Sequence, residues 1–311
     1  MKPKFVVIHR TDINNVGDMS SNPLRYFLKP EEYMVLDIDT LGGKPYPDDV
    51  PIIVGGGGLI GNEFFGENIA LALEHPDAVQ INNLWQHRWE LVNLKYKDMH
   101  VEFHTKLKDM VNDALTKIDK HKTPKVIWGV GHNIQKFGQD DVPNLKYPKF
   151  MKDFNIVGIR DFVPHQPYEF VPCASCMDPS LNKTYPIKND IVIIEHKKQL
   201  LKGAEFGALS IPRFVNSGDN LEQMIELIGS ANIVISNSYH AIYWATLLKK
   251  KTICVGAWSS KFFTLKHKPH YIKSIGKELE EAIDEAKIYE TALEESVMAN
   301  RRMWDRVRAL V

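Results

Sequence analysis

His240 is the residue of this chain that is best placed to carry out acid–base chemistry. It follows the apolar run 233–236 closely and begins a segment with helical character, 240–249. The end of a strand that leads into a helix is the edge of an open α/β sheet where ligands bind, and a helix N-terminus there favours anions. Because imidazole has an unperturbed pKa of about 6.5, both of its forms are available near neutrality. We therefore expect His240 to be catalytic; the alternative is a histidine held by hydrogen bonds inside the fold.

A second group of polar residues follows the first apolar run. Asp18 closes the loop after this run, and its carboxylate is the best candidate to polarise a hydroxyl group of a substrate. The alternative is a helix N-cap, a role that the sequence Gly17-Asp18-Met19-Ser20 would suit. His9 and Arg10 end the same run, and we expect them at the mouth of the same cleft.

Four consecutive glycines, Gly55, Gly56, Gly57 and Gly58, follow the apolar stretch 51–54. Glycine runs occur where the backbone turns sharply or approaches another group closely. A strand that ends in such a turn before a helix offers backbone N–H groups to anionic or polyhydroxy ligands. The run lacks the lysine of the GxxxxGK[ST] motif and the context of a dinucleotide fingerprint. We expect it to line the cleft; the alternative is a tight turn packed beneath a helix.

Groups of potential metal ligands are sparse. Asp37-Ile38-Asp39 has the D-x-D spacing that holds a metal in some nucleotide-sugar enzymes, but no further cluster accompanies it. Cys173-x-x-Cys176 lacks the second pair that a structural zinc site needs. We therefore expect no metal and no cofactor, and the three cysteines favour a reduced, cytoplasmic setting.

The elements that must position these residues alternate between short β-rich runs and helical stretches. This alternation is typical of parallel sheets with crossover helices, so the predicted class is α/β. The predicted strands are 4–9, 33–38, 52–54, 125–129, 156–159, 191–195, 233–236 and 252–255.

Helical periodicity predicts further elements. Apolar residues share one face over 102–121, and 221–229 reads as an amphipathic helix capped by Asp219 or Ser217. A long amphipathic stretch, 277–310, ends the chain. The polar, proline-bearing segment 178–186 separates two series of strands, which predicts a first domain over 1–185, a second over 186–276 and a helical tail over 277–311.

Composition narrows the class of protein. At 311 residues, two domains are the natural expectation, and 44% hydrophobic with 25% charged residues is ordinary for a globular protein. Lys+Arg and Asp+Glu both total 39, so no overall field favours nucleic acid. No segment approaches the roughly 18 apolar residues that span a bilayer, so we expect no integral membrane segment.

Motifs spread along the chain together resemble the polysaccharide pyruvyl transferase family. They resemble, in order, the family's N-x-G-D opening, its glycine run, a G-x-G segment, an R-D before an interdomain D-P, the turn that bears the central histidine, and a downstream basic residue. The corresponding segments here are Asn15–Asp18, 54–59, 128–131, Arg160-Asp161 with Asp178-Pro179, 235–241 and Ser259-Ser260-Lys261.

This resemblance implies two Rossmann-like, doubly wound domains that face a cleft, as in glycosyltransferase-B enzymes. Members transfer the pyruvyl group of phosphoenolpyruvate to a sugar hydroxyl, form a ketal or an enol ether, and release phosphate. The second domain tends to hold phosphoenolpyruvate and the first faces the sugar or polysaccharide acceptor. The tail, by analogy with that architecture, crosses back onto the first domain.

The resemblance also implies roles for individual residues. Phosphoenolpyruvate carries roughly three negative charges, so its site needs several cationic groups. For the donor we rank Lys261 first, then Lys197 and Lys198, and add Ser236, Asn237 and Ser238 from the histidine-bearing turn; on the acceptor side lie Asn15 and Gly17. Many members carry arginine where this chain has Ser238. Arg160 is either a ligand for an anion or a structural partner of Asp161 or Asp178, and we favour the structural role.

Two other functions fit the same architecture. One is a nucleotide-sugar glycosyltransferase, and the other is a non-catalytic relative that binds glycans or anions. The serine at position 238 keeps the second of these open.

Overall fold

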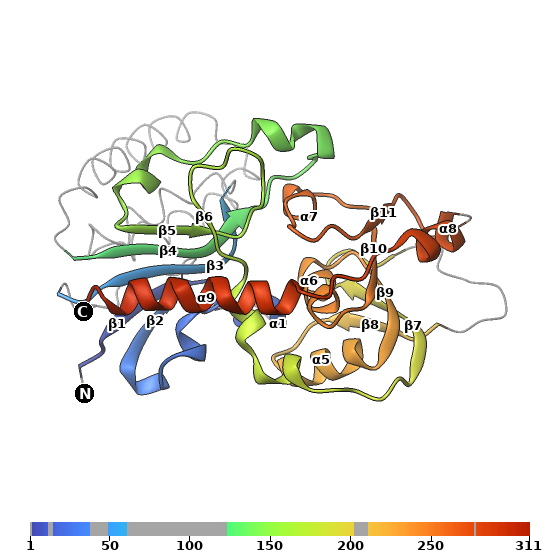
Figure 1. Cartoon of the computed structure of the whole chain (residues 1–311), viewed down its shortest axis with the longest axis horizontal. Coiled ribbons are helices and arrows are strands. Elements are labelled where there is room, and N and C mark those ends of the chain that lie inside the picture. The colour runs from blue at the N-terminus through green and yellow to red at the C-terminus, as the bar shows by residue number, and fades with distance from the viewer. Residues whose placement is uncertain (1, 12–14, 38–48, 61–122, 202–210, 277) are drawn as a thin grey trace, which may run out of the picture.

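The computed structural model describes residues 2–11, 15–37, 49–60, 123–201, 211–276 and 278–311. These residues form two parallel β-sheets with helices packed against them, in a Rossmann-like arrangement of two domains. The predicted α/β class is therefore confirmed. The sheets lie side by side along the long axis of the molecule (Figure 1).

The first sheet has six strands in the order β2-β1-β3-β4-β5-β6. Its central strands are continuous apolar runs, as expected for parallel strands that are buried on both faces. Successive side chains point to opposite faces, so Val6 and Ile8 join one core cluster whereas Phe5 and Val7 join the other. The strands are β1 (Phe5–His9), β2 (Tyr33–Asp37), β3 (Ile52–Ile60), β4 (Lys125–His132), β5 (Ile156–Ile159) and β6 (Glu169–Phe170).

The second sheet has five strands in the order β11-β10-β9-β7-β8. The strands are β7 (Asn189–His196), β8 (Arg213–Asn216), β9 (Ala231–Ser236), β10 (Lys251–Val255) and β11 (His270–Ile272). Helices α5 (Leu221–Gly229) and α6 (Tyr239–Leu247) pack against β9 on the same side. Every residue of α6 is buried. Since no side of this helix contacts water, it has no polar face.

Several predicted elements differ from the structure in their extent. The strands predicted at 52–54 and 125–129 continue to Ile60 and His132, while β6, β8 and β11 were absent from the prediction. The cap of α5 is Asn220, whose side chain accepts a hydrogen bond from the backbone of Gln223, and not Asp219 or Ser217. The predicted helix 102–121 lies outside the described residues.

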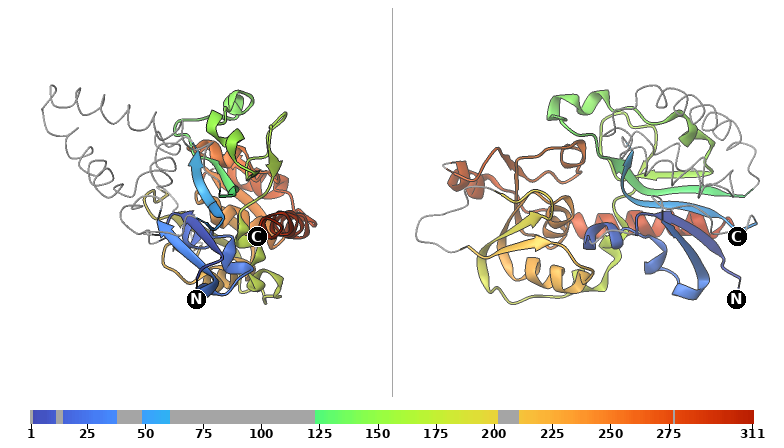
Figure 2. Two further views of the ribbon diagram at one scale, coloured as in Figure 1. Left: turned by 90° about the vertical axis from the view of Figure 1, so that its left-hand side faces the viewer. Right: turned by 180° about the vertical axis from the view of Figure 1, so that it is seen from behind.

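The carboxy-terminal stretch is two helices and not one. Helix α8 (Glu278–Glu285) packs on β10 and β11 of the second sheet, and α9 (Ala292–Arg308) returns along one face of the first sheet (Figures 1 and 2). Met303 and Val307 of α9 are fully buried in the same cluster as Phe5 and Trp128. Asn300 accepts a hydrogen bond of 2.8 Å from the indole of Trp128. The chain therefore crosses between the domains twice.

Two short α-helices and several short 3₁₀ helices complete the described elements. These are α1 (Val16–Met19) and α7 (Ser260–Phe263), and the 3₁₀ helices Leu24–Tyr26, Pro30–Glu32, Gln139–Asn144, Lys149–Asp153, Ala174–Met177 and Pro179–Asn182. Among the residues described, no helix combines the length and the apolar character that crossing a membrane would need.

Candidate functional site

A cavity of about 300 Å³ lies where strands of both sheets end. In each sheet the strand order reverses beside one strand, next to β1 in the first sheet and next to β7 in the second. Ligands of open α/β sheets bind at such reversals, beyond the carboxyl ends of the strands. The cavity is lined from the first domain by Arg10, Asn15, Asp18, Gly58, Asn133, Gln135 and Arg160, and from the second by His196, Lys197, Lys198, Gln199, Ser238, Tyr239, His240, Trp258 and Lys261.

The wall of the cavity is strongly basic. Its arginines and lysines come from both domains, and among the described residues that line it Asp18 is the single carboxylate. The chain as a whole has no net charge at pH 7. The positive charge is thus concentrated locally, which favours an anionic ligand at this position.

Arg160 is the most informative residue of the cavity. Its side chain is 4% exposed, and its Nε and Nη1 atoms have no hydrogen-bond partner among the described residues. The predicted structural pairing is wrong, because Asp161 bonds His132 and Thr264 while Asp178 accepts from Ser180. A buried guanidinium with unused donors is costly. The charge of an anion in the cavity would offset that cost.

Arg160 is held in place by packing. Its guanidinium carbon lies 4.2 Å from the centre of the Tyr239 ring, a cation–π contact across the domain boundary. A side chain at Gly131 or Gly58 would collide with it: an added Cβ would lie 2.5 Å from Arg160 Cγ at Gly131 and 3.0 Å from Nη2 at Gly58. These two glycines therefore leave the space that the arginine occupies.

Lys261 approaches the cavity from the second domain. It lies in α7, and its Nζ is 4.2 Å from the centre of the Trp258 ring. Burial lowers the pKa of Lys261 to about 8, and the positive charge of Arg160 adds to this effect while Asp18 opposes it. At neutral pH the ammonium is still mostly charged, so Arg160 and Lys261 offer two cations to one ligand.

His240 lines the cavity but is 5% exposed. Burial, assisted by the charges of Arg160 and Lys261, lowers its pKa well below 6.5. The expectation that both protonation forms coexist near neutrality is therefore wrong for the unliganded protein, in which the ring is neutral. Its Nε2 atom lies 3.7 Å from the thiol of Cys173, and its other edge packs on Gly17.

The loop after β1 divides its residues between structure and cavity. Asn15 is the N-cap of α1 and accepts a hydrogen bond from the backbone of Gly17. Asp18 is therefore not the cap, and its half-buried side chain lines the cavity instead. Gly17 does not line the cavity; a Cβ there would lie 2.0 Å from Nδ1 of His240, so its role is to admit the ring.

The glycine run continues β3 and does not form a turn at its end. Gly56 and Gly57 have positive φ angles of 66° and 90°, which disfavour other residues. Of the four predicted cleft glycines, Gly58 lines the cavity. A Cβ added at Gly55 or Gly56 would instead collide with Pro23 or Ser21, and one added at Gly57 would lie nearest to Leu59 and to the carboxylate of Asp18.

Three residues at the end of β9 and in the turn after it were predicted to bind the donor, and one of them lines the cavity. Ser238 lines the cavity and accepts a hydrogen bond from Asn216. Ser236 is fully buried and donates to the carbonyl of Ile194, and Asn237 ties the turn after β7 by bonding His196 N and Gln199 O. Ser236 and Asn237 therefore shape the site without lining it.

The end of β7 brings further positive charge. Lys197 and Lys198 both line the cavity, together with His196. The pKa of His196 falls to about 4, first through burial and then through the charges of Lys261, Lys198 and Lys197.

Of the predicted pair at the end of β1, Arg10 lines the cavity and His9 does not. His9 is 3% exposed, and burial lowers its pKa to about 4. Its imidazole therefore belongs to the core of the first domain.

Residues absent from the prediction complete the cavity. Tyr239 and Trp258 contribute aromatic rings, and Asn133, Gln135 and Gln199 contribute amides. Each follows a strand end, so position alone was the available signal. Asp37, from the D-x-D pattern, accepts hydrogen bonds from the backbone and hydroxyl of Thr11, and the other residues of that pattern lie outside the described ranges.

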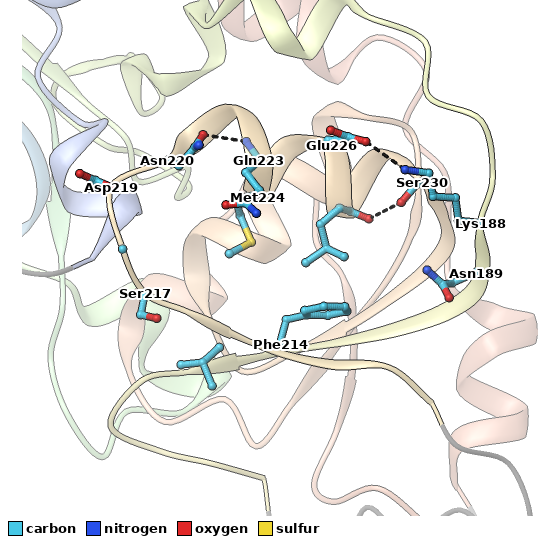
Figure 3. A pocket seen from close by; sticks show the side chains of 13 residues that line it. Lys188, Asn189, Phe214, Ser217, Asp219, Asn220, Gln223, Met224, Glu226 and Ser230 are labelled. Carbon is cyan, nitrogen blue, oxygen red and sulfur yellow. Dashed lines mark hydrogen bonds and ion pairs between the residues drawn. The ribbon is translucent and has the colours of Figure 1, made fainter.

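A larger groove, of about 590 Å³, lies between β8 and α5 of the second domain (Figure 3). It is lined by Phe214 and Met224 together with polar side chains, and its one lysine, Lys188, pairs with Glu226. None of the predicted site residues lines it. We therefore place the candidate site in the interdomain cavity.

Comparisons with known proteins give distant structural likenesses. No protein-family model matches the chain, and no curated protein matches it. A crystal structure of an uncharacterised protein from Klebsiella pneumoniae is similar with a TM-score of 0.40 and 13% sequence identity, over 82% of this chain and 83% of that one.

Proposed function

We propose that the protein is a transferase of glycosyltransferase-B-like architecture that moves the pyruvyl group of phosphoenolpyruvate onto a sugar hydroxyl. The observation that carries this proposal is the convergence of Arg160 and Lys261, from two domains, on one cavity that also contains His240. The motif resemblance and the basic wall both support an anionic donor. The acceptor is a saccharide.

The cations match the charges of the donor. Phosphoenolpyruvate carries a phosphate and a carboxylate, and the planar guanidinium of Arg160 can bind either group through two hydrogen bonds. Lys261 adds a second positive charge to the same cavity. Together they would stabilise the charge that develops on the departing phosphate.

The chemistry needs three events at the donor. In ketal formation two acceptor hydroxyls lose their protons, of which one is taken up by the methylene carbon and the other leaves with the phosphate. The neighbouring carbon forms bonds to the two acceptor oxygens, and its bond to the phosphate oxygen breaks. Since His240 is neutral before ligands bind, we assign it the removal of a proton from the attacking hydroxyl. Asp18, on the opposite domain, polarises a hydroxyl of the acceptor.

Phosphate release from phosphoenolpyruvate tests this proposal. The protein is incubated with the donor and a panel of galactosyl, mannosyl and N-acetylmannosaminyl acceptors. We expect His240→Asn to lower kcat by roughly 10²–10⁴-fold at a temperature at which the variant remains folded. His165→Asn is the matched control, because His165 is exposed and its positive φ of 59° suits asparagine.

Two results would contradict the proposal. One is phosphate release by His240→Asn at the rate of the unmodified protein. The other is the absence of both phosphoenolpyruvate binding and phosphate release for the unmodified protein with every acceptor.

A further inference from the structure

The two domains are joined by hydrogen bonds along one wall of the cavity. Ser260 N donates to Ile134 O at 2.9 Å, and Lys136 N donates to Trp258 O at 3.2 Å. Phe162 N donates to Thr264 O at 2.8 Å. The segment 258–264 of the second domain is therefore bound through its backbone to residues that follow β4 and β5 of the first.

Asp161 connects the most deeply buried residues of this contact. Its carboxylate accepts from the hydroxyl of Thr264 at 2.9 Å and bonds the ring of His132 at 2.6 Å. The backbone N–H of His132 also donates to it. Asp161, His132 and Thr264 are 0%, 1% and 2% exposed. Removing a hydrogen-bond partner from a buried carboxylate destabilises the fold. The three side chains therefore have little freedom to move apart.

The two residues of this hydrogen bond, Asp161 and Thr264, are close in sequence to the two cations of the candidate site. Asp161 directly follows Arg160, and Thr264 ends the single turn of α7 that carries Lys261. The bond between Asp161 and Thr264 thus links the two segments that present positive charge to the cavity.

We propose that Thr264 is a positioning residue, whose hydrogen bond to Asp161 sets the separation of Arg160 and Lys261 across the domain boundary. This inference rests on the proposed binding of an anionic donor between these two cations. The cations are held together before the ligand arrives, against their mutual repulsion. Binding then needs less ordering of these two side chains, which increases the affinity for the anionic donor.

The test compares two buried threonines. Thr264→Val removes the hydroxyl that reaches Asp161, and Thr264→Ser restores it. Thr246→Val is the matched control: Thr246 is 4% exposed, and its hydroxyl donates within α6 to Ile242 O. The dissociation constant for phosphoenolpyruvate and Tm are measured for each variant.

We expect Thr264→Val to weaken phosphoenolpyruvate binding about tenfold, because part of the binding free energy must then be used to bring the two cations together. Thr264→Ser should bind within about twofold of the unmodified protein, as should Thr246→Val despite any loss of Tm. Equal effects of the two valine substitutions, or unchanged binding by Thr264→Val, would overturn the positioning role.

A second measurement needs no ligand and separates this inference from the proposed function. If the cations move apart in Thr264→Val, the repulsion by Arg160 weakens and the pKa of Lys261, followed by NMR, rises above about 8, while burial still holds it below 10.5. Should the unmodified protein fail to bind phosphoenolpyruvate, the proposed function fails while this titration still decides the positioning role. An unchanged pKa of Lys261 in that case would overturn it.

Discussion

At the scale of single residues, burial changes the chemistry that each side chain can perform. The Arg160 guanidinium stays charged, while His240 becomes neutral. Lys261 lies between these extremes, because its pKa of about 8 is close to physiological pH. Its charge is therefore one that small changes in pH can remove.

Lys261 should make donor binding dependent on pH. The ammonium is charged below about pH 8 and loses its proton above, so the affinity for phosphoenolpyruvate should fall as pH rises from about 7 to 9.5. Calorimetric titration measures the effect, which we expect to be about tenfold. Lys261→Arg should abolish the dependence, because arginine stays charged throughout. Lys188→Arg, at an exposed ion pair with Glu226, is the control and should keep it; a flat profile for the unmodified protein would contradict the assignment.

At the scale of elements, glycines admit side chains from elsewhere in the fold. Gly17 in α1 makes room for the His240 ring of α6, and Gly131 at the end of β4 makes room for Arg160. In both cases the backbone at the glycine lies so close to a side chain of the candidate site that a Cβ atom would collide with it. The glycines therefore act as spacers for the site, not as ligands.

Substitution of Gly17 tests this role. In Gly17→Ala the new methyl group would lie 2.0 Å from His240 Nδ1, so the ring or the helix must move. We expect a loss of about 1–3 kcal/mol in stability and a lower kcat. Gly276→Ala is the matched control, since nothing lies within 4 Å of its added Cβ. Urea unfolding and phosphate release measure both effects, and a Gly17→Ala protein that matches Gly276→Ala in both would contradict the packing argument.

Sequence patterns predicted the long, buried parallel strands well. They predicted the short strands and the long-range side-chain contacts poorly. Runs such as 4–9 and 233–236 are apolar on both faces, so burial alone marks them as strands. The short strands β6, β8 and β11 have little apolar sequence, and their pairing depends on neighbours that a local pattern does not contain. Arg160 was misassigned for the same reason: Asp161 is adjacent in sequence, yet its carboxylate bonds Thr264, which is 103 positions away.

At the scale of the whole molecule, buried neutral histidines make stability depend on acidity. The pKa of His9 is about 4 in the folded protein and near 6.5 in an unfolded chain. The unfolded state thus takes up the proton first. The stabilisation by His9 is complete above about pH 6.5 and is lost as pH falls towards 4. His240, whose pKa is also lowered by burial, acts in the same direction.

Urea unfolding between about pH 7 and 4.5 measures this dependence. We expect the unmodified protein to lose up to about 1.4 kcal/mol per pH unit for each such histidine. His9→Gln removes one titrating group, so its stability should fall less steeply over the same range. Parallel curves for the two proteins would show that His9 is not buried in its neutral form.

The position of α9 has a consequence for synthesis of the chain. Strand β1 leaves the ribosome long before α9, so Phe5 and Trp128 are made before Met303 and Val307, which cover them in the fold. The nascent first domain therefore carries an uncovered apolar surface until α9 has been made. Such intermediates aggregate readily, so early termination of translation upstream of α9 should yield insoluble fragments that recruit chaperones.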